Sequence, residues 1–415
     1  MAESVRNDAE LLISELPWLV REDSSPAYSF AYRIGWDDPQ RLWVPKLLEQ
    51  YATHKTDASP SFLGGYLRAI FNRNAEEWES VMLDPATADR FSDFVVNSGM
   101  TDVIARRVID QCRGGLQSKD RLERWWFDRQ LQQLDEGIVK ELIGLQLEDG
   151  VGTLWSNAVQ MCHTFYMEKE NERPLPEELL FELLTADAMA DGRVVHSASY
   201  YWSRLAKAFI NQFPHREWDL FRQVFRVAMH GWSILEDLDT NEEAILTTSL
   251  RKDPKTAWAC IAGVYREARE RGDYLRQHWL AAGGHRIIGD DNPGPIQFVP
   301  AEVLFDWVDE NVEQHGYWLT RVLPKTLDES SAGRLTRDFV ARYGKDESIR
   351  RGLYAHFHSH GWCGNASDHY RKLREQARGW LTGEKSVTVI RWIEDYIDGP
   401  SYDIERAEIE EERRI

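Results

Sequence analysis

A helical recurrence of apolar residues runs through almost the whole chain, and it limits the possible folds more than any other feature. After a start signal at Asp253 and Pro254, the apolar residues Trp258, Ile261 and Tyr265 recur at i, i+3 and i+7. Roughly twenty such segments follow one another, joined by short polar or Gly/Pro connections. Alternating strand patterns are almost absent. The sequence therefore predicts an all-α fold.

A second helix start shows how closely some of these helices are expected to pack. Ser59 is suited to capping a helix and Pro60 to its first turn. The apolar run that follows contains Gly64 and Gly65, which have no Cβ atom. We expect these two glycines to allow close packing against neighbouring helices.

Two distant segments, residues 93–106 and 338–351, align without a gap. Each is interpreted as a helix, a glycine in a left-handed turn, an acidic start and a second amphipathic helix. The offset between them corresponds to about six units of ~41 residues, in the range of HEAT or armadillo helix pairs. Coincidence is the alternative, because helix-stop and helix-start rules alone would give the shared glycine and acidic residue. The shared positions are Asp93/Asp338, Phe94/Phe339, Val95/Val340, Gly99/Gly344, Ile104/Ile349 and Arg106/Arg351.

Helix pairs of this kind need not enclose one spherical core, because in a solenoid each pair packs only against its neighbours. We expect an α-solenoid of stacked antiparallel helix pairs, HEAT- or armadillo-like, with about twenty helices. Residues 1–282 would form its N-terminal portion and the Gly/Pro-rich stretch 283–300 a long loop or hinge. Residues 301–415 would form its C-terminal portion, ending in a short, charged capping helix at 403–415.

The composition excludes several classes of protein. With 50 Lys and Arg against 69 Asp and Glu, the net charge is −19, which disfavours nucleic acid as the general partner. No apolar run is long enough to span a membrane, and no signal peptide is recognised. The 17 tryptophans are interpreted as packing between helix layers rather than as a ligand cage. The cysteines have no paired spacing and are expected to be buried thiols in the cytoplasm; they are Cys112, Cys162, Cys260 and Cys363.

The densest group of potential metal ligands lies between residues 355 and 370. Its imidazole and thiol groups are of the kind that zinc accepts in a tetrahedral site. No standard zinc spacing is present, so no cofactor is the leading expectation. A zinc-dependent enzyme or a metal-stabilised domain is the alternative. The candidate ligands are His356, His358, His360 and Cys363, followed by His369.

A locally basic run at 106–129 could hold a nucleic-acid single strand, because its cations are interleaved with Trp125 and Trp126. Acidic residues in the same run offset much of this charge, as on an ordinary solvated helix face. A nucleic-acid-binding subunit is a further alternative. The candidate contact residues are Arg106, Arg107, Arg113, Lys119, Arg121 and Arg124.

No residue is assigned a catalytic role. The stretch 150–155 lacks the Gly-Lys-Ser/Thr of a phosphate loop and predicts the start of a helix instead. On that helix the adjacent residues Cys162 and His163 diverge by about 100°, so they cannot form a catalytic pair.

Packing motifs occur in five blocks, at 62–82, 97–110, 303–309, 334–344 and 357–381, before an acidic tail. These blocks resemble the helical-repeat C-terminal regions of large bacterial multidomain proteins. Such regions often follow nucleotide-binding or effector modules, and they are associated with antiphage defence and signalling. The resemblance covers roughly two-thirds of the chain, in packing motifs rather than catalytic ones. In such relatives the position of His360 is more usually part of a Ser-Gly turn, which argues against a metal site.

We therefore expect a non-enzymatic helical-repeat scaffold, sensor or regulator that binds another protein within a larger complex. The resemblance implies a setting in bacterial antiphage defence. The partner is expected to present a basic face or to contact exposed members of the aromatic set.

Overall fold

The structure, a computed structural model, describes residues 9–21, 25–54, 57–84, 87, 91–124, 129–168, 173–191, 193–228, 245–270, 295–359 and 364–413. It is 79% helical, with twenty α-helices and no strand in these ranges. The predicted all-α fold is confirmed. None of the helices described here is both long and apolar enough to cross a membrane.

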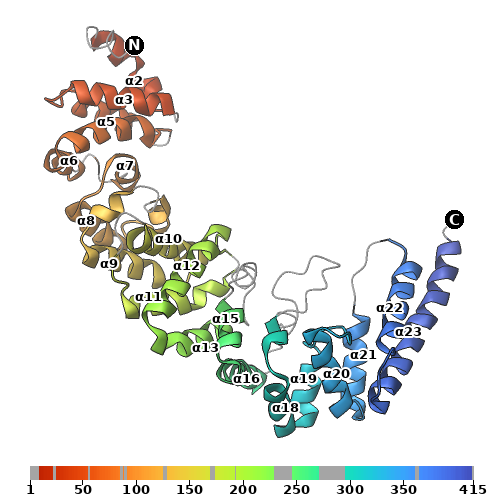
Figure 1. The fold of residues 1–415 in the computed structure, drawn as a ribbon. Helices are drawn as coiled ribbons and strands as arrows, with labels where there is room; N and C mark the ends of the chain where they lie inside the picture. The colour runs from red at the N-terminus through yellow and green to blue at the C-terminus, as the bar shows by residue number, and fades with distance from the viewer. Residues whose placement is uncertain are drawn as a thin grey trace. The chain divides into compact units, whose positions relative to one another are not determined.

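The chain divides into two compact units, residues 1–212 and 213–415. Figure 1 shows the first in red to green and the second in green to blue. The predicted break at 283–300 falls mostly outside the described residues, which omit 271–294, so it stays a prediction.

The first unit is built from short helices, several of which begin where the sequence predicts. Ser59 Oγ accepts the Ser61 N–H at the start of α5, and α10 starts at Gly152. The helices are α2 (Ala9–Leu19), α3 (Ser25–Asp37), α4 (Val44–Thr53), α5 (Pro60–Arg73), α6 (Ala75–Met82), α7 (Phe91–Ser98), α8 (Asp102–Arg113), α9 (Glu136–Leu147), α10 (Gly152–Met167), α11 (Glu177–Thr185) and α12 (His196–Gln212).

The second unit follows the same local rules. Asp253 Oδ1 accepts the Thr256 N–H and so caps α16, as predicted. The helices are α13 (Glu217–Ala228), α15 (Ile245–Lys252), α16 (Pro254–Glu270), α18 (Ala301–Glu310), α19 (Tyr317–Leu319), α20 (Ser331–Tyr343), α21 (Glu347–His358), α22 (Ala366–Trp380) and α23 (Val387–Glu412).

Glycines let α5 lie against two neighbouring helices at once. A Cβ added to Gly65 would overlap the Tyr28 carbonyl oxygen of α3, and one added to Gly64 would overlap Asn97 of α7. From the α3 side, a Cβ on Gly35 would lie 2.6 Å from the Tyr66 carbonyl oxygen. The close packing predicted for Gly64 and Gly65 is confirmed.

Side-chain hydrogen bonds between neighbouring helices recur at a similar sequence separation. Asn72 bonds to Tyr32 across 40 residues, Gln160 to Ser197 across 37, and the Tyr354 hydroxyl to the Trp392 carbonyl across 38. In the first unit, Ser156 and Gln160 of α10 meet Val195 and Ser197 in the same order, so α10 and α12 run parallel. A contact period near 40 residues is close to the repeat length predicted from the sequence.

Both segments of the predicted internal repeat contain two consecutive helices, α7 and α8 in one and α20 and α21 in the other. The left-handed turn expected at their glycines is wrong, because neither Gly99 nor Gly344 is among the glycines with positive φ. Gly344 has a right-handed φ of −64°. A Cβ there would lie 2.5 Å from the Val340 carbonyl oxygen, and one on Gly99 would overlap the Phe71 ring. Glycine is therefore required at these two positions because a Cβ atom would clash with neighbouring atoms, and not because the backbone is left-handed there.

Residues 403–412 do not form a separate short helix, which corrects the prediction for 403–415. They are the last turns of α23, a single helix of 26 residues that continues through Pro400. The Ser401 hydroxyl donates to the Ile397 carbonyl within this helix. The end of α23 packs on α22, where the Glu411 carboxylate accepts the backbone N–H and the hydroxyl of Ser367.

Buried tryptophans pack on one another, most densely in the second unit. The rings of Trp258, Trp307 and Trp318 form a triangle with centroids 5.3 to 5.9 Å apart. Their indole N–H groups have no hydrogen-bond partner. Two of the three ring pairs are edge-to-face, with interplanar angles of 80° and 85°. In this geometry the face of a neighbouring ring can act as a weak acceptor for an N–H group. Rings this close leave no room for a ligand between them, which agrees with the packing role expected from the sequence.

Three of the four cysteines are free and buried, as predicted: Cys112, Cys162 and Cys260. Burial raises the pKa of each of these thiols. Cys363 lies outside the described residues.

Candidate functional site

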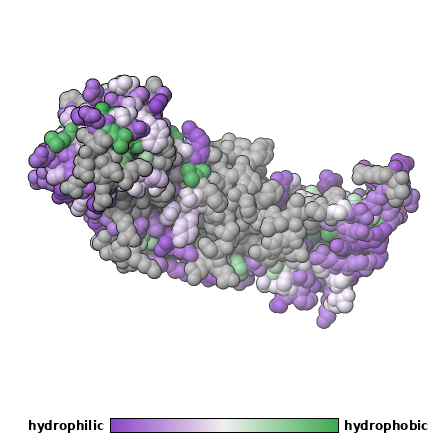
Figure 2. Space-filling model, turned by 90° about the horizontal axis from the view of Figure 1, so that it is seen from above, coloured by the Kyte–Doolittle hydropathy of each residue, from purple (hydrophilic) through white to green (hydrophobic). Residues whose placement is uncertain are grey.

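Two apolar residues beside the end of α3 are exposed to solvent. Ser29, Arg33 and Trp36 share the outer stripe of this helix, and the Trp36 residue is 46% exposed. Its ring stacks on Tyr32 with centroids 6.1 Å apart. Leu42, in the loop that follows, is 66% exposed. We call Tyr32, Trp36 and Leu42 the α3 aromatic surface. On the face shown in Figure 2, the coloured residues are mainly hydrophilic, with a few separate green groups of hydrophobic residues among them.

The backbone beneath the α3 aromatic surface is held by buried polar groups. Arg73 of α5 donates to the carbonyl oxygens of Gly35 and Trp36. Because these two residues lie in the last turn of α3, their carbonyl oxygens have no N–H partner within the helix. Asp38 is buried and accepts hydrogen bonds from the Tyr66 hydroxyl at 2.6 Å and from the Trp43 N–H at 3.0 Å. These bonds fix the chain on both sides of Trp36.

The loop that carries Leu42 contains a strained residue. Arg41 has a φ of 59°, a left-handed conformation that is costly for a residue with a side chain. Its guanidinium lies 3.3 Å from Ser80 Oγ and 3.8 Å from a Glu77 oxygen, both on α6. These contacts hold the loop on α6 while Leu42 remains exposed.

A second candidate site lies inside the first unit, on α10. Polar residues occupy a sector of about 120° around this helix. Those from residue 156 to residue 164 are nevertheless buried, with at most 6% of the residue exposed, whereas Thr153 in the same sector is half-buried. The members of this α10 polar sector are Ser156, Asn157, Gln160, His163 and Thr164.

The α10 polar sector is only partly satisfied by the surrounding protein. Gln160 Nε2 donates to Ser197 Oγ at 3.1 Å, and the His163 ring packs on the Tyr201 ring at 4.8 Å. Asn157 Nδ2, Gln160 Oε1 and His163 Nε2 have no hydrogen-bond partner. A buried polar group left unpaired costs about 1–3 kcal/mol, so three together on one helix face call for an explanation.

His163 is electrically neutral at physiological pH. Burial lowers its pKa to about 4 because it disfavours the imidazolium, and the positive charge of Arg204 lowers it further. Its Nε2 is therefore available either as a donor or as an acceptor, depending on which ring nitrogen carries the proton.

The same pKa shift predicts an acid-sensitive contribution to stability. Between pH 6.5 and 4 the unfolded imidazole binds a proton and the folded one does not, so stability falls as the pH falls. At pH 5 the expected loss from this group is about 2 kcal/mol relative to neutral pH. His163→Phe should lack this part of the loss, which urea unfolding at pH 7 and pH 5 measures. Equal pH dependence in both proteins would contradict the buried neutral imidazole.

The structure describes two of the four predicted metal ligands. His356 and His358 both lie on α21 but, two residues apart, point in different directions. His356 Nε2 bonds to the Leu323 carbonyl oxygen at 2.8 Å, and the His358 ring lies 5.0 Å from that of Tyr396. Among the described residues no cluster of three His, Cys, Asp or Glu could hold a metal ion. The other two ligands, His360 and Cys363, lie outside the described residues, so the zinc site stays a prediction.

The predicted nucleic-acid contacts are largely engaged with the chain's own acidic groups. Arg106 and Arg113 both pair with Glu141, at 2.5 and 3.0 Å. Lys119 pairs with the carboxylates of residues 148 and 149, at 2.8 and 3.0 Å. Arg107 lies 3.5 Å from the carbonyl oxygen of residue 83. The side chains of Arg121 and Arg124 lie outside the described residues.

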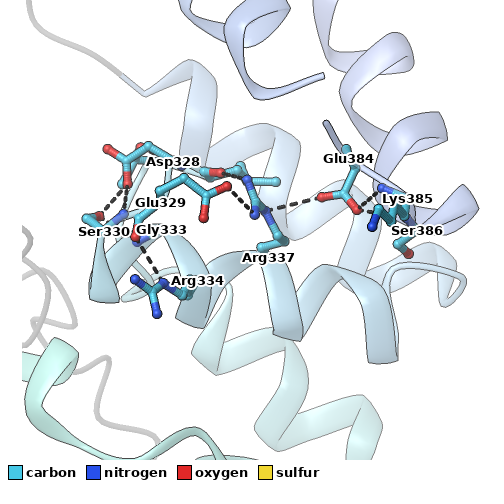
Figure 3. Close-up of polar contacts among 11 residues, drawn as sticks. Asp328, Glu329, Ser330, Gly333, Arg334, Arg337, Glu384, Lys385 and Ser386 are labelled. Carbon is cyan, nitrogen blue, oxygen red and sulfur yellow. Dashed lines mark hydrogen bonds and ion pairs between the residues drawn. The ribbon is translucent and has the colours of Figure 1, made fainter. Parts of the chain in front are cut away.

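The second unit contains a polar network around Arg337 of α20, which Figure 3 shows between two acidic side chains. Its guanidinium lies 3.0 Å from Glu329 and 3.2 Å from Glu384, and it donates to the Leu327 carbonyl. Glu384 in turn accepts the backbone N–H groups of residues 385 and 386, before α23. The ion pairs and main-chain bonds give the network a structural role in fixing α20 to the start of α23.

Neither candidate site was predicted from the sequence. The α10 polar sector is visible in the sequence as an amphipathic pattern, but a polar stripe on a helix ordinarily indicates solvent exposure. The α3 aromatic surface contains a tryptophan that was expected, like the others, to pack between layers. The α10 polar sector is a candidate site because its residues are buried, and the α3 aromatic surface because Trp36 is exposed. In both cases the exposure of the side chains depends on which helices pack nearby.

No protein-family model, curated protein or solved structure matches this chain.

Proposed function

We propose that this chain is a helical-repeat protein that binds another protein through the α3 aromatic surface. The exposure of Trp36 on a rigid support is the observation that carries this proposal. Tryptophan, tyrosine and arginine are enriched at the energetic centres of protein interfaces. A support that is already ordered lowers the entropy lost on binding.

The contact period near 40 residues supports an arrangement of stacked helix pairs, an α-solenoid. In such a protein each pair packs on its neighbours, and residues on the outer stripes remain available to a partner. The sequence resemblance supports a regulatory or scaffolding role in bacterial antiphage defence as the setting. The partner should offer an apolar pocket for the indole of Trp36.

Site-specific crosslinking tests this function. A photoreactive benzoylphenylalanine at Leu42 of the full chain, in the cells that naturally produce it, is expected to capture one partner protein. The same group at Leu116, which is 79% exposed, serves as the control for nonspecific capture. The proposal fails if position 42 captures nothing beyond the products found at position 116.

Trp36→Ser should weaken binding to the captured partner at least tenfold, because it removes the central aromatic contact. The substitution should change the free energy of unfolding by no more than about 1 kcal/mol, since the residue is 46% exposed. Leu116→Ser is the matched control and should bind as the wild type does. Affinities can be measured by surface plasmon resonance. Undiminished binding by Trp36→Ser would rule out the α3 aromatic surface as the contact site.

A further inference from the structure

We propose that this chain associates with a second copy of itself, and that the outer face of α12 in one copy packs antiparallel on the outer face of α23 in the other. α12 belongs to the first unit and α23 to the second. Because the contact joins unlike faces of two identical chains, it is a head-to-tail contact. It is independent of the protein-binding function proposed above, since it does not use the α3 aromatic surface.

The outer face of α12 is basic and aromatic, although the chain as a whole is acidic. Residues 192–216, which include all of α12, contain no Asp or Glu and form the longest such run in the sequence. Tyr200 is 56% exposed, and the exposed Arg204 donates to its hydroxyl and lies over its ring. No acidic group among the described residues pairs with Arg204. An unpaired guanidinium beside an exposed aromatic ring is suited to a partner that offers a carboxylate next to an apolar side chain.

Five residues of α12 form a single stripe along this face. They follow one another at intervals of three, four, three and four residues, which keeps side chains on one side of a helix. Four of them are exposed and Lys207 is half-buried. The members of this α12 stripe are Ser197, Tyr200, Arg204, Lys207 and Asn211.

The outer face of α23 has the complementary composition. Tyr402 is 68% exposed and Ile409 is 51% exposed, and the two lie about two turns apart on the helix. Exposed carboxylates alternate with these two residues. The neighbouring cation Arg406 pairs with Glu410, and no cation among the described residues pairs with Glu405. The members of this α23 stripe are Asp398, Tyr402, Glu405, Ile409 and Glu412.

The two stripes match position by position when the helices run antiparallel. The α12 stripe read forwards and the α23 stripe read backwards have the same intervals of three, four, three and four residues. This register sets a ring against an apolar side chain, one cation against a carboxylate and the other cation against a ring face. The central pairs are Tyr200 with Ile409, Arg204 with Glu405 and Lys207 with Tyr402.

Charge disfavours the pairing of like faces. Two α23 stripes packed together would place the carboxylates of residues 398, 405 and 412 against one another. Two α12 stripes would likewise place Arg204 and Lys207 against the same cations of the second copy. Like charges that meet across an interface are destabilising, whereas the unlike stripes are electrostatically complementary. The second copy should therefore offer α23 to α12.

Sedimentation equilibrium of the full chain tests this inference. The average mass of the wild type should rise with protein concentration, and less steeply in high salt, which screens the charges. Arg204→Glu and Ile409→Glu should each associate at least tenfold more weakly, because each sets a new carboxylate against the opposite stripe. The proposal is overturned if the wild type keeps the mass of one copy up to millimolar concentration, or if either variant associates as the wild type does.

A mixture of the two variants separates this contact from every other mode of association and from misfolding. Arg204→Glu keeps an intact α23 stripe and Ile409→Glu an intact α12 stripe, so one wild-type contact can form between them. The mixture should give a heterodimer with the wild-type association constant and no larger species, because both remaining stripes carry the added carboxylate. A mixture in which no heterodimer forms would refute the contact.

Two further substitutions serve as matched controls on other helices. Arg350→Glu on α21 makes the same change of charge as Arg204→Glu at an exposed position. Val103→Glu on α8 replaces an apolar residue that is 50% exposed, as Ile409→Glu does. Both controls should associate as the wild type does. If they weakened association as much as the two test variants, the effect would come from net charge and the assigned faces would be wrong.

Discussion

Gly65→Ala is expected to lower the free energy of unfolding by about 3 kcal/mol, through the packing of α3 against α5. The added methyl group would overlap the Tyr28 carbonyl oxygen and lie 3.0 Å from its carbonyl carbon. Both are main-chain atoms, so no change of rotamer relieves the overlap and the two helices must separate. Urea unfolding measures the loss, and hydrogen exchange by mass spectrometry should locate it in α3 and α5.

A second glycine provides the matched control for this prediction. Gly144 lies inside α9, and an added Cβ there meets no atom within 4 Å. Gly144→Ala should therefore raise stability by roughly 0.5–1 kcal/mol, because alanine favours a helix over the unfolded chain. If Gly65→Ala proved as stable as Gly144→Ala, the close contact between α3 and α5 would be wrong.

Trp318→Ala is expected to cost about 3–5 kcal/mol in the second unit. The residue is only 2% exposed, and its ring lies within 6 Å of Trp258, Trp307 and Tyr265. Removing the indole leaves a cavity that rigid aromatic neighbours can fill only in part. The loss can be measured by urea unfolding monitored through circular dichroism.

Tyr402→Ala tests whether burial, rather than the loss of any aromatic ring, causes this effect. Tyr402 lies on α23 in the same unit and is 68% exposed. Its substitution should change the free energy of unfolding by no more than about 0.5 kcal/mol. Comparable losses in the two variants would mean that Trp318 is not part of a packed core.

The helices were predictable because their signals are local. Asp253 caps α16 and Ser59 caps α5 by hydrogen bonds that span two or three residues, so neighbouring letters of the sequence suffice to recognise them. The role of Gly344 was not predictable in the same way. A glycine after a helix suggests a left-handed turn, yet here it is required because a Cβ would meet the Val340 carbonyl oxygen.

The candidate sites depend on contacts between helices, which local rules do not reach. Arg106 and Arg113 follow the pattern of a basic surface. In the structure both pair with Glu141, which lies 35 and 28 residues later in the chain, on α9. Likewise, the spacing of Gln160 and His163 is that of a solvent-facing stripe. In the structure they are buried because α12 lies alongside α10, where Ser197 and Tyr201 contact them. The partner in each case comes from another helix.

The sequence by itself determined the all-α class, the helix starts and the close packing at Gly64 and Gly65, since helix propensity, capping and the lack of a Cβ atom are properties of nearby residues. Only the tertiary structure decided that Trp36 is exposed while Gln160 and His163 are buried. Exposure is set by which helices pack together, and that depends on residues about 40 positions apart.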